Sequence, residues 1–201
     1  MENTKLTRSA TIMDRILKIL QGFAAAGVIV AAIFIPLTAI FGEKIIASAD
    51  TLSLGALKLE LSGAMENYLD FSTIKVSIIV MLVGTILVSA ATWYGLKVLR
   101  GILAPMKEGT PFAEGISGKI RKLAWTALIG GGVAELGQVI SEVSMVQAYQ
   151  VERLVNPEFV ENFTYTCSLN LWFVVAALIL FVLSYIFRCG EQLQQEADET
   201  L

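Results

Sequence analysis

Four long apolar runs, separated by polar segments, constrain the fold of this chain more than any other feature. A hydrocarbon layer of about 30 Å is crossed by around 20 apolar residues in a helix. The runs at residues 22–41, 74–98, 123–146 and 167–187 meet that length. Only 16% of the residues are charged and 55% are hydrophobic, whereas soluble domains have about 25% charged residues. The sequence predicts an all-α membrane protein, a single four-transmembrane-helix bundle covering residues 1–201.

The positions of lysine and arginine predict the orientation of the bundle, because cytoplasmic loops are enriched in these residues. The N-terminal tail, the middle polar segment with its flanking Lys97, and the C-terminal tail hold 11 of the 15 lysines and arginines. We therefore expect both termini, the loop 99–122 and the tail 188–201 in the cytoplasm. The loops 42–73 and 147–166 are expected on the outside.

Two of the loops are predicted to carry structure of their own. Residues 51–62 alternate leucine with small or charged residues around a central glycine, which predicts a short β-hairpin. We expect it to cap the bundle on its outer side or to bind a ligand there. In the middle loop, Pro111 opens a stripe of Phe112, Ile116 and Ile120. This spacing predicts a short amphipathic helix at the cytoplasmic membrane interface, which anchors the loop or docks a regulator.

Several function classes are excluded by composition. The chain has no histidine and two cysteines, Cys167 and Cys189, which excludes His-based triads, His-ligated metals and a CxxC redox pair. A net charge of −3 offers no basic face for direct nucleic-acid binding. We therefore expect no enzyme activity, no catalytic residues, no metal and no cofactor.

The third apolar run is unusual because it contains Glu135, Gln138 and Glu142. Their spacings of three and four residues place them on one face of a helix. A charged side chain at the bilayer centre costs about 2.5–3.5 kcal/mol or more, so this face is expected to point into the bundle or a wet cavity. It is either a packing surface between helices or a site for a proton, cation or polar ligand. The neutral side chains predicted as partners of Glu135 are Thr85, Ser89 and Ser184.

The C-terminal tail is predicted to mark the end of the last helix. Arg188 suits the negative end of a helix dipole, and Gly190 suits a C-cap or a turn. The acidic segment 191–201 would then fold back on the middle loop or face a basic soluble partner. The basic residues predicted to receive it in the loop are Arg100, Lys119, Arg121 and Lys122.

Two short motifs carry a resemblance to a known family. Residues 109–112 read Gly-Thr-Pro-Phe, and the tail reads aromatic-Arg-x-Gly at 187–190, followed by an acidic stretch that ends Asp-x-Thr-Leu at 198–201. In these motifs the chain resembles the YoaS-like family of bacterial four-helix membrane proteins, classed as a domain of unknown function. The resemblance implies the bacterial cytoplasmic membrane as location. Members are often encoded beside a small helix-turn-helix repressor, which implies such a regulator as a cytoplasmic partner.

Three functional hypotheses follow. The leading one is a non-enzymatic regulatory or sensory membrane protein that binds a partner on its cytoplasmic face. The second is a small transporter, or an ion- or proton-coupled permeability protein, that uses Glu135, Gln138 and Glu142. The third is an immunity protein that uses the external hairpin against a membrane-active peptide. Homo-oligomers are compatible with all three.

Overall fold

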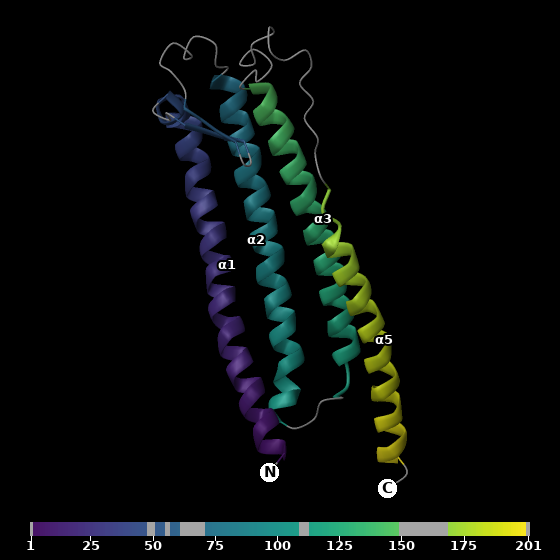
Figure 1. The fold of residues 1–201 in the computed structure, drawn as a ribbon. Helices are drawn as coiled ribbons and strands as arrows, with labels where there is room; N and C mark the ends of the chain where they lie inside the picture. The colour runs from purple at the N-terminus through teal and green to yellow at the C-terminus, as the bar shows by residue number, and fades with distance from the viewer. Residues whose placement is uncertain are drawn as a thin grey trace. The chain divides into compact units, whose positions relative to one another are not determined.

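The computed structural model describes residues 2–47, 51–54, 57–60, 71–108, 113–148 and 169–199. Helices and strands within these ranges are coloured along the chain in Figure 1. In chain order they are α1 (Glu2–Ala47), β1 (Thr51–Leu54), β2 (Leu57–Glu60), α2 (Phe71–Lys107), α3 (Ile116–Ala148) and α5 (Trp172–Glu199).

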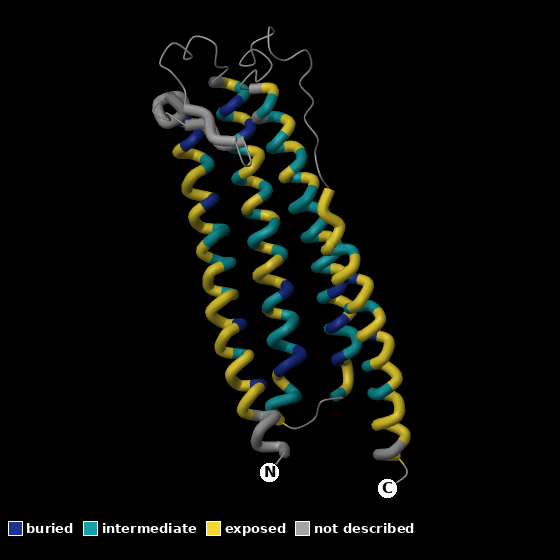
Figure 2. The backbone as a smooth tube through the Cα atoms, viewed as in Figure 1, coloured by how far each residue is buried: buried dark blue, intermediate teal, exposed yellow. Residues whose placement is uncertain are grey.

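Four helices in the described part of the chain are long and apolar enough to cross a membrane: Arg8–Gly42, Ser72–Lys107, Ile116–Ser144 and Trp172–Glu196. Exposed residues follow all four helices in Figure 2. Many of them are large and apolar, for example Phe23, Ile129 and Leu178 at 71%, 61% and 58% exposure. Exposing so much apolar surface to water is unfavourable, whereas hydrocarbon solvates it well. The prediction of four apolar helices that fit a multi-pass membrane protein is confirmed.

The helices extend beyond the apolar runs that predict them. α2 continues to Lys107 and α3 begins at Ile116, so most of the predicted loop 99–122 is helical. In the helical parts, residues 99–107 and 116–122, ten of the sixteen residues are lysine, arginine, leucine or isoleucine, and most of these are good helix formers. Counting apolar residues predicts where hydrocarbon is crossed, but a helix continues as long as neighbouring helices pack against it.

The predicted interfacial helix is wrong as a separate element. Ile116 and Ile120 lie in the first turns of α3 and are only 0% and 6% exposed. They form a buried cluster with Ile102 of α2, and apolar residues from α2, α3 and α5 pack around it. The i, i+4 spacing of these isoleucines therefore serves contact between helices, which produces the same pattern as contact with lipid. Pro111 and Phe112, the start of the predicted stripe, lie outside the described residues.

The predicted end of the last helix at Gly190 is also wrong. Arg188 and Gly190 lie inside α5, which continues to Glu199. One glycine costs a helix only about 1 kcal/mol, and glutamate, glutamine, leucine and alanine after it all favour the helix. The acidic tail is therefore a helical extension of the last apolar helix up to Glu199.

The chain divides into two compact units. One comprises Met1–Ile29, Ile86–Ala134 and Asn170–Leu201, and the other comprises Val30–Thr85 and Glu135–Leu169. In the first, the N-terminal part of α1 lies against the C-terminal part of α2, the start of α3 lies against α2, and α5 lies against α3. In the second, Thr38 of α1 and Ile74 and Ser77 of α2 are buried.

The two strands lie within the segment for which the sequence predicts a hairpin. β1 and β2 pair antiparallel, with Thr51 opposite Glu60 and Leu54 opposite Leu57. The two residues between the strands are Gly55 and Ala56, which lie outside the described residues. The role of this pair as a cap stays a prediction.

Close approach of α3 to its neighbours depends on two consecutive glycines. A Cβ atom on Gly130 would lie 2.9 Å from the Cβ atom of Ala91 in α2, and a Cβ atom on Gly131 would collide with the Phe173 side chain of α5. The next glycine, Gly132, has only an ordinary contact, 3.8 Å to the Phe173 ring. Gly130 and Gly131 are therefore required for packing, and Gly132 is not.

We predict that Gly131→Ala destabilises the protein while Gly132→Ala does not. The two substitutions gain the same helix propensity, but only the first inserts a methyl group into a filled contact, which costs about 1–3 kcal/mol. The midpoint of thermal unfolding in detergent should fall for Gly131→Ala and stay unchanged or rise for Gly132→Ala. Equal midpoints for the two variants would contradict the packing shown here.

Candidate functional site

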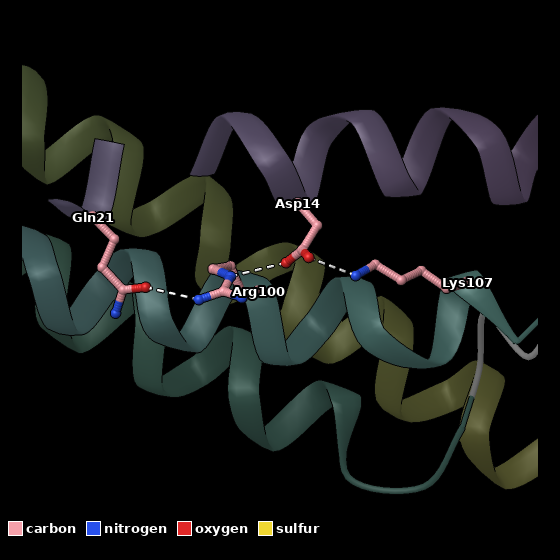
Figure 3. A network of polar contacts seen from close by, with 4 residues as sticks. All are labelled: Asp14, Gln21, Arg100 and Lys107. Carbon is pink, nitrogen blue, oxygen red and sulfur yellow. Dashed lines mark hydrogen bonds and ion pairs between the residues drawn. The ribbon is translucent and has the colours of Figure 1, made fainter. Parts of the chain in front are cut away.

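A network of four polar side chains joins α1 to α2 (Figure 3). Arg100 donates from Nε to Asp14 Oδ1 at 2.8 Å and from Nη1 to Gln21 Oε1 at 2.9 Å. Lys107 Nζ binds the other carboxylate oxygen of Asp14 at 2.7 Å. The three charged side chains are between 19% and 32% exposed, so the network is partly screened from solvent.

The spacing within this network matches the geometry of the two helices. Asp14 and Gln21 are seven residues apart on α1, and Arg100 and Lys107 are seven apart on α2. Seven residues are close to two helical turns, so each pair occupies one face of its helix. Two cations share one carboxylate, which leaves this cluster with one net positive charge. In the sequence, Arg100 and Lys107 mark the orientation, and Arg100 is also expected to receive the acidic tail; no sequence pattern predicts Asp14 as their partner.

A second polar contact fixes α5 to the start of α3. Glu191 accepts two hydrogen bonds from Ser117, one from the backbone N–H to Oε1 at 2.6 Å and one from Oγ to Oε2 at 2.8 Å. Ser184 Oγ donates to the carbonyl oxygen of Ser117 at 2.9 Å. Ser184 and Glu191 are again seven residues apart on one helix.

The role of Glu191 follows from the geometry at the start of α3. The first N–H groups of a helix lack partners within the helix, and the helix dipole favours a negative charge there. Glu191 therefore acts as a cap supplied by another helix. Gly115, just before α3, has a φ of +83°, a conformation that glycine adopts without the steric cost other residues meet.

Two of the four basic residues predicted to receive the acidic tail have other partners. Arg100 binds Asp14 and Gln21, and Lys119 Nζ donates to the carbonyl oxygen of Gly101 at 3.0 Å. The tail instead approaches α3 through Glu191. Sequence reasoning placed the tail near the correct loop, but it could not identify a serine backbone N–H as the contact.

Two of the three residues of the predicted polar face of α3, Gln138 and Glu142, are joined by a hydrogen bond. Gln138 Nε2 donates to Glu142 Oε1 at 3.1 Å; Gln138 is exposed, and Glu135 and Glu142 are half-buried. Two predicted partners of Glu135 use their hydroxyl protons elsewhere. Thr85 donates to the carbonyl oxygen of Met81 at 2.9 Å, and Ser184 donates to Ser117. The polar face therefore contains at least one hydrogen bond within its own helix.

The predicted turn and tail motifs are described in part. Arg188 is exposed and Gly190 half-buried on α5. Pro111, Phe112, Thr200 and Leu201 lie outside the described residues.

No protein-family model, curated protein or solved structure matches this chain. The resemblance to the YoaS-like family therefore stays a prediction, carried by the two short motifs alone.

We predict that Asp14→Asn destabilises the protein, because Arg100 and Lys107 would then face each other without a shared carboxylate. The effect on the unfolding midpoint should shrink as salt rises from about 0.1 M to about 1 M, since the screening length falls from about 10 Å to about 3 Å. Arg15→Gln, a change at the exposed neighbouring residue, is the control. In a double-mutant cycle with Lys107→Gln, additive effects would show that the ion pair contributes nothing to stability.

We also predict that Glu191→Ala loosens the start of α3. Losing a capping acceptor costs a helix about 0.5–2 kcal/mol, so backbone amides around Ser117 should exchange with deuterium about twofold to thirtyfold faster. Glu199→Ala removes the same charge from an exposed position of α5 and should leave this exchange unchanged. Hydrogen–deuterium exchange followed by mass spectrometry measures both, and equal rates in the two variants would rule out the cap.

Proposed function

We propose that this protein is a non-enzymatic regulatory or sensory membrane protein, which binds a soluble protein through the C-terminal end of α5. The observation that carries the proposal is the helical extension of α5 beyond its apolar part, held on α3 by Glu191. A helix that continues from hydrocarbon into an exposed acidic surface connects the membrane to a soluble partner.

The surface of this extension suits a protein partner. Residues 192–196 are all exposed, and among them Leu193 is 67% exposed. The segment 191–201 contains four acidic residues and no basic one. An exposed leucine among acidic and amide side chains offers both apolar contact and complementarity to a basic partner.

The contacts at Ser117 support a regulatory role for this surface. Glu191 and Ser184 lie on α5, and both bind the first turn of α3. A partner that tilts the end of α5 would strain or break these hydrogen bonds. Binding at the tail and the position of α3 would then be coupled, since each would favour one arrangement of the contact.

The proposed orientation rests on the distribution of positive charge. Residues 1–18, 97–122 and 188–201 contain 11 of the 15 lysines and arginines, which favours the location of these parts of the chain in the cytoplasm. The strand pair would then lie outside, as a cap on the external ends of the helices. By its resemblance to the YoaS-like family, the protein would reside in the bacterial cytoplasmic membrane, with a helix-turn-helix regulator as its partner.

A second candidate function is the transport of a proton, cation or small polar solute. It is favoured by the exposure of Gln138 and by its hydrogen bond to Glu142 in an otherwise apolar part of α3. Polar side chains within membrane segments often line such pathways. The same side chains would equally serve packing between helices, so this candidate ranks second.

We predict that deleting residues 192–201 reduces partner binding at least tenfold while leaving the fold intact. The deletion removes the exposed extension but keeps Glu191, so that the cap on α3 remains. The measurement is the affinity of the purified helix-turn-helix regulator, encoded by the neighbouring gene, for the full-length chain and for the shortened chain, both in detergent. Undiminished binding by the shortened chain would contradict the role of α5, and no binding by either would contradict the proposed partner.

The control is the double variant Glu135→Gln, Glu142→Gln, which changes the polar face of α3 and leaves α5 intact. Partner binding should be the same as in the unaltered chain. Ion and proton flux into vesicles, measured on the same variant, tests the second candidate. Transport would be favoured over regulation if the unaltered chain supported a flux that this variant lost, and if neither chain bound the soluble partner.

A further inference from the structure

A polar cavity of about 400 Å³ lies between α3 and α5 in the first unit. Its volume falls in the lower part of the range of small-molecule sites, about 300–1,000 Å³. The lining residues that matter for binding are two arginines, two serines and two aromatic residues: Arg121, Arg188, Ser117, Ser184, Phe181 and Tyr185.

The two arginines give this cavity its charge. Arg121 is on α3 and Arg188 on α5, and both are exposed. Within the described part of the chain, neither belongs to the ion pairs of the fold, which join Asp14 to Arg100 and Lys107. The nearest acidic side chain along α5 is Glu191, whose two oxygens are bound by Ser117. Two guanidinium groups are thus presented to the cavity while the start of α3 is already occupied by Glu191.

Aromatic side chains show where the cavity lies relative to the apolar surface of α3 and α5. Trp125, one turn after Arg121, packs edge-to-face on Phe181 with ring centroids 5.4 Å apart. Trp125 is 52% exposed, and Tyr185, one turn after Phe181, is 70% exposed. Tryptophan and tyrosine gather where hydrocarbon meets the headgroups of a membrane. Arg121 and Arg188 lie nearer to the polar ends of their helices than the Trp125–Phe181 pair does. In a bilayer whose interface is marked by these aromatic residues, the two arginines would face the headgroups.

We propose that this cavity binds a phosphate-bearing anion, with Arg121 and Arg188 as the residues that hold its oxygens. Arginine favours phosphate because its planar N–H groups match the phosphate oxygens. The Tyr185 hydroxyl provides a further donor at the same cavity. With Glu191 counted, the local side chains carry one net positive charge, which the single negative charge of a phosphodiester neutralises. The site is separate from the exposed residues 192–196 of the partner surface proposed above, which do not line it.

The anion comes either from the headgroup of an acidic phospholipid or from a soluble phosphate. The exposed Trp125 surface beside the cavity suits a lipid, because acyl chains attached to a bound headgroup would lie along it. Basic pockets between membrane helices bind acidic headgroups in this way. The two sources share the same contacts to arginine and are distinguished by experiment.

The test is native mass spectrometry and thermal unfolding of the full-length chain in neutral detergent, with phosphatidylglycerol, phosphatidylcholine or inorganic phosphate added. We expect phosphatidylglycerol to bind and to raise the unfolding midpoint more than phosphatidylcholine. In Arg121→Gln, Arg188→Gln its affinity should fall at least tenfold, to the level of phosphatidylcholine. The double variant Arg121→Lys, Arg188→Lys, which keeps both charges, should retain part of the binding.

The matched control is Arg15→Gln, Lys18→Gln, which removes two positive charges from exposed positions of α1 and should bind phosphatidylglycerol unchanged. The proposal would be overturned if the control lost as much binding as Arg121→Gln, Arg188→Gln, or if this cavity variant bound phosphatidylglycerol as well as the unaltered chain does. It would also be overturned if the unaltered chain preferred neither phosphatidylglycerol nor inorganic phosphate to phosphatidylcholine. If inorganic phosphate stabilises the chain as well as the lipid does, and the cavity variant removes this effect, the site is a phosphate site and the lipid is not its source. Partner affinity of the cavity variant should be unchanged.

Discussion

A backbone that crosses hydrocarbon has no water to bind its N–H and C=O groups, and every other feature of this protein depends on that constraint. In an α-helix all of these groups are paired within the segment. Four apolar helices satisfy the constraint, and their large exposed side chains match a lipid environment. Polar chemistry is thereby confined to helix ends, to the segments between helices, and to a few positions where one helix contacts another.

At those positions in the first unit, the same seven-residue spacing recurs. Asp14 and Gln21 face Arg100 and Lys107, and Ser184 and Glu191 bind the start of α3 together. The first contact ties α1 to α2 at levels two turns apart, whereas Ser184 and Glu191, two turns apart on α5, both bind Ser117 of α3. Such paired contacts specify the register of one helix against another, which apolar packing alone specifies less strictly because neighbouring ridges offer similar fits.

The two proposals place different chemistry on the same helix. The end of α5 presents an exposed acidic surface, whereas Arg188, nearer to its apolar part, presents a cation to the cavity it shares with α3. Glu191 lies between these two parts of α5, and its carboxylate accepts a hydrogen bond from Ser117 of α3. A phosphate bound at Arg121 and Arg188 would lie beside the same hydrogen bonds that a soluble partner would disturb.

The sequence by itself determined the number of apolar helices, because hydrocarbon thickness sets a minimum length that can be counted in residues. It also predicted a hairpin in the segment where β1 and β2 pair, because alternation around a glycine is a local signal. The ends of the helices were harder to predict. The residues around Ile116 remain helical because neighbouring helices pack against them, and α5 continues past Gly190 because one glycine costs little and good helix formers follow it.

Only the tertiary structure decided which side chains meet. Glu191 is 74 residues from Ser117, and Arg100 is 86 residues from Asp14, so no local pattern links them. The same applies to the cavity. The sequence predicts Arg121 as a contact of the acidic tail and Arg188 as a helix-end residue, and packing of α3 on α5 brings the two to one site. Spacing within a helix can be read from the chain, whereas the partner on the next helix depends on the register between them.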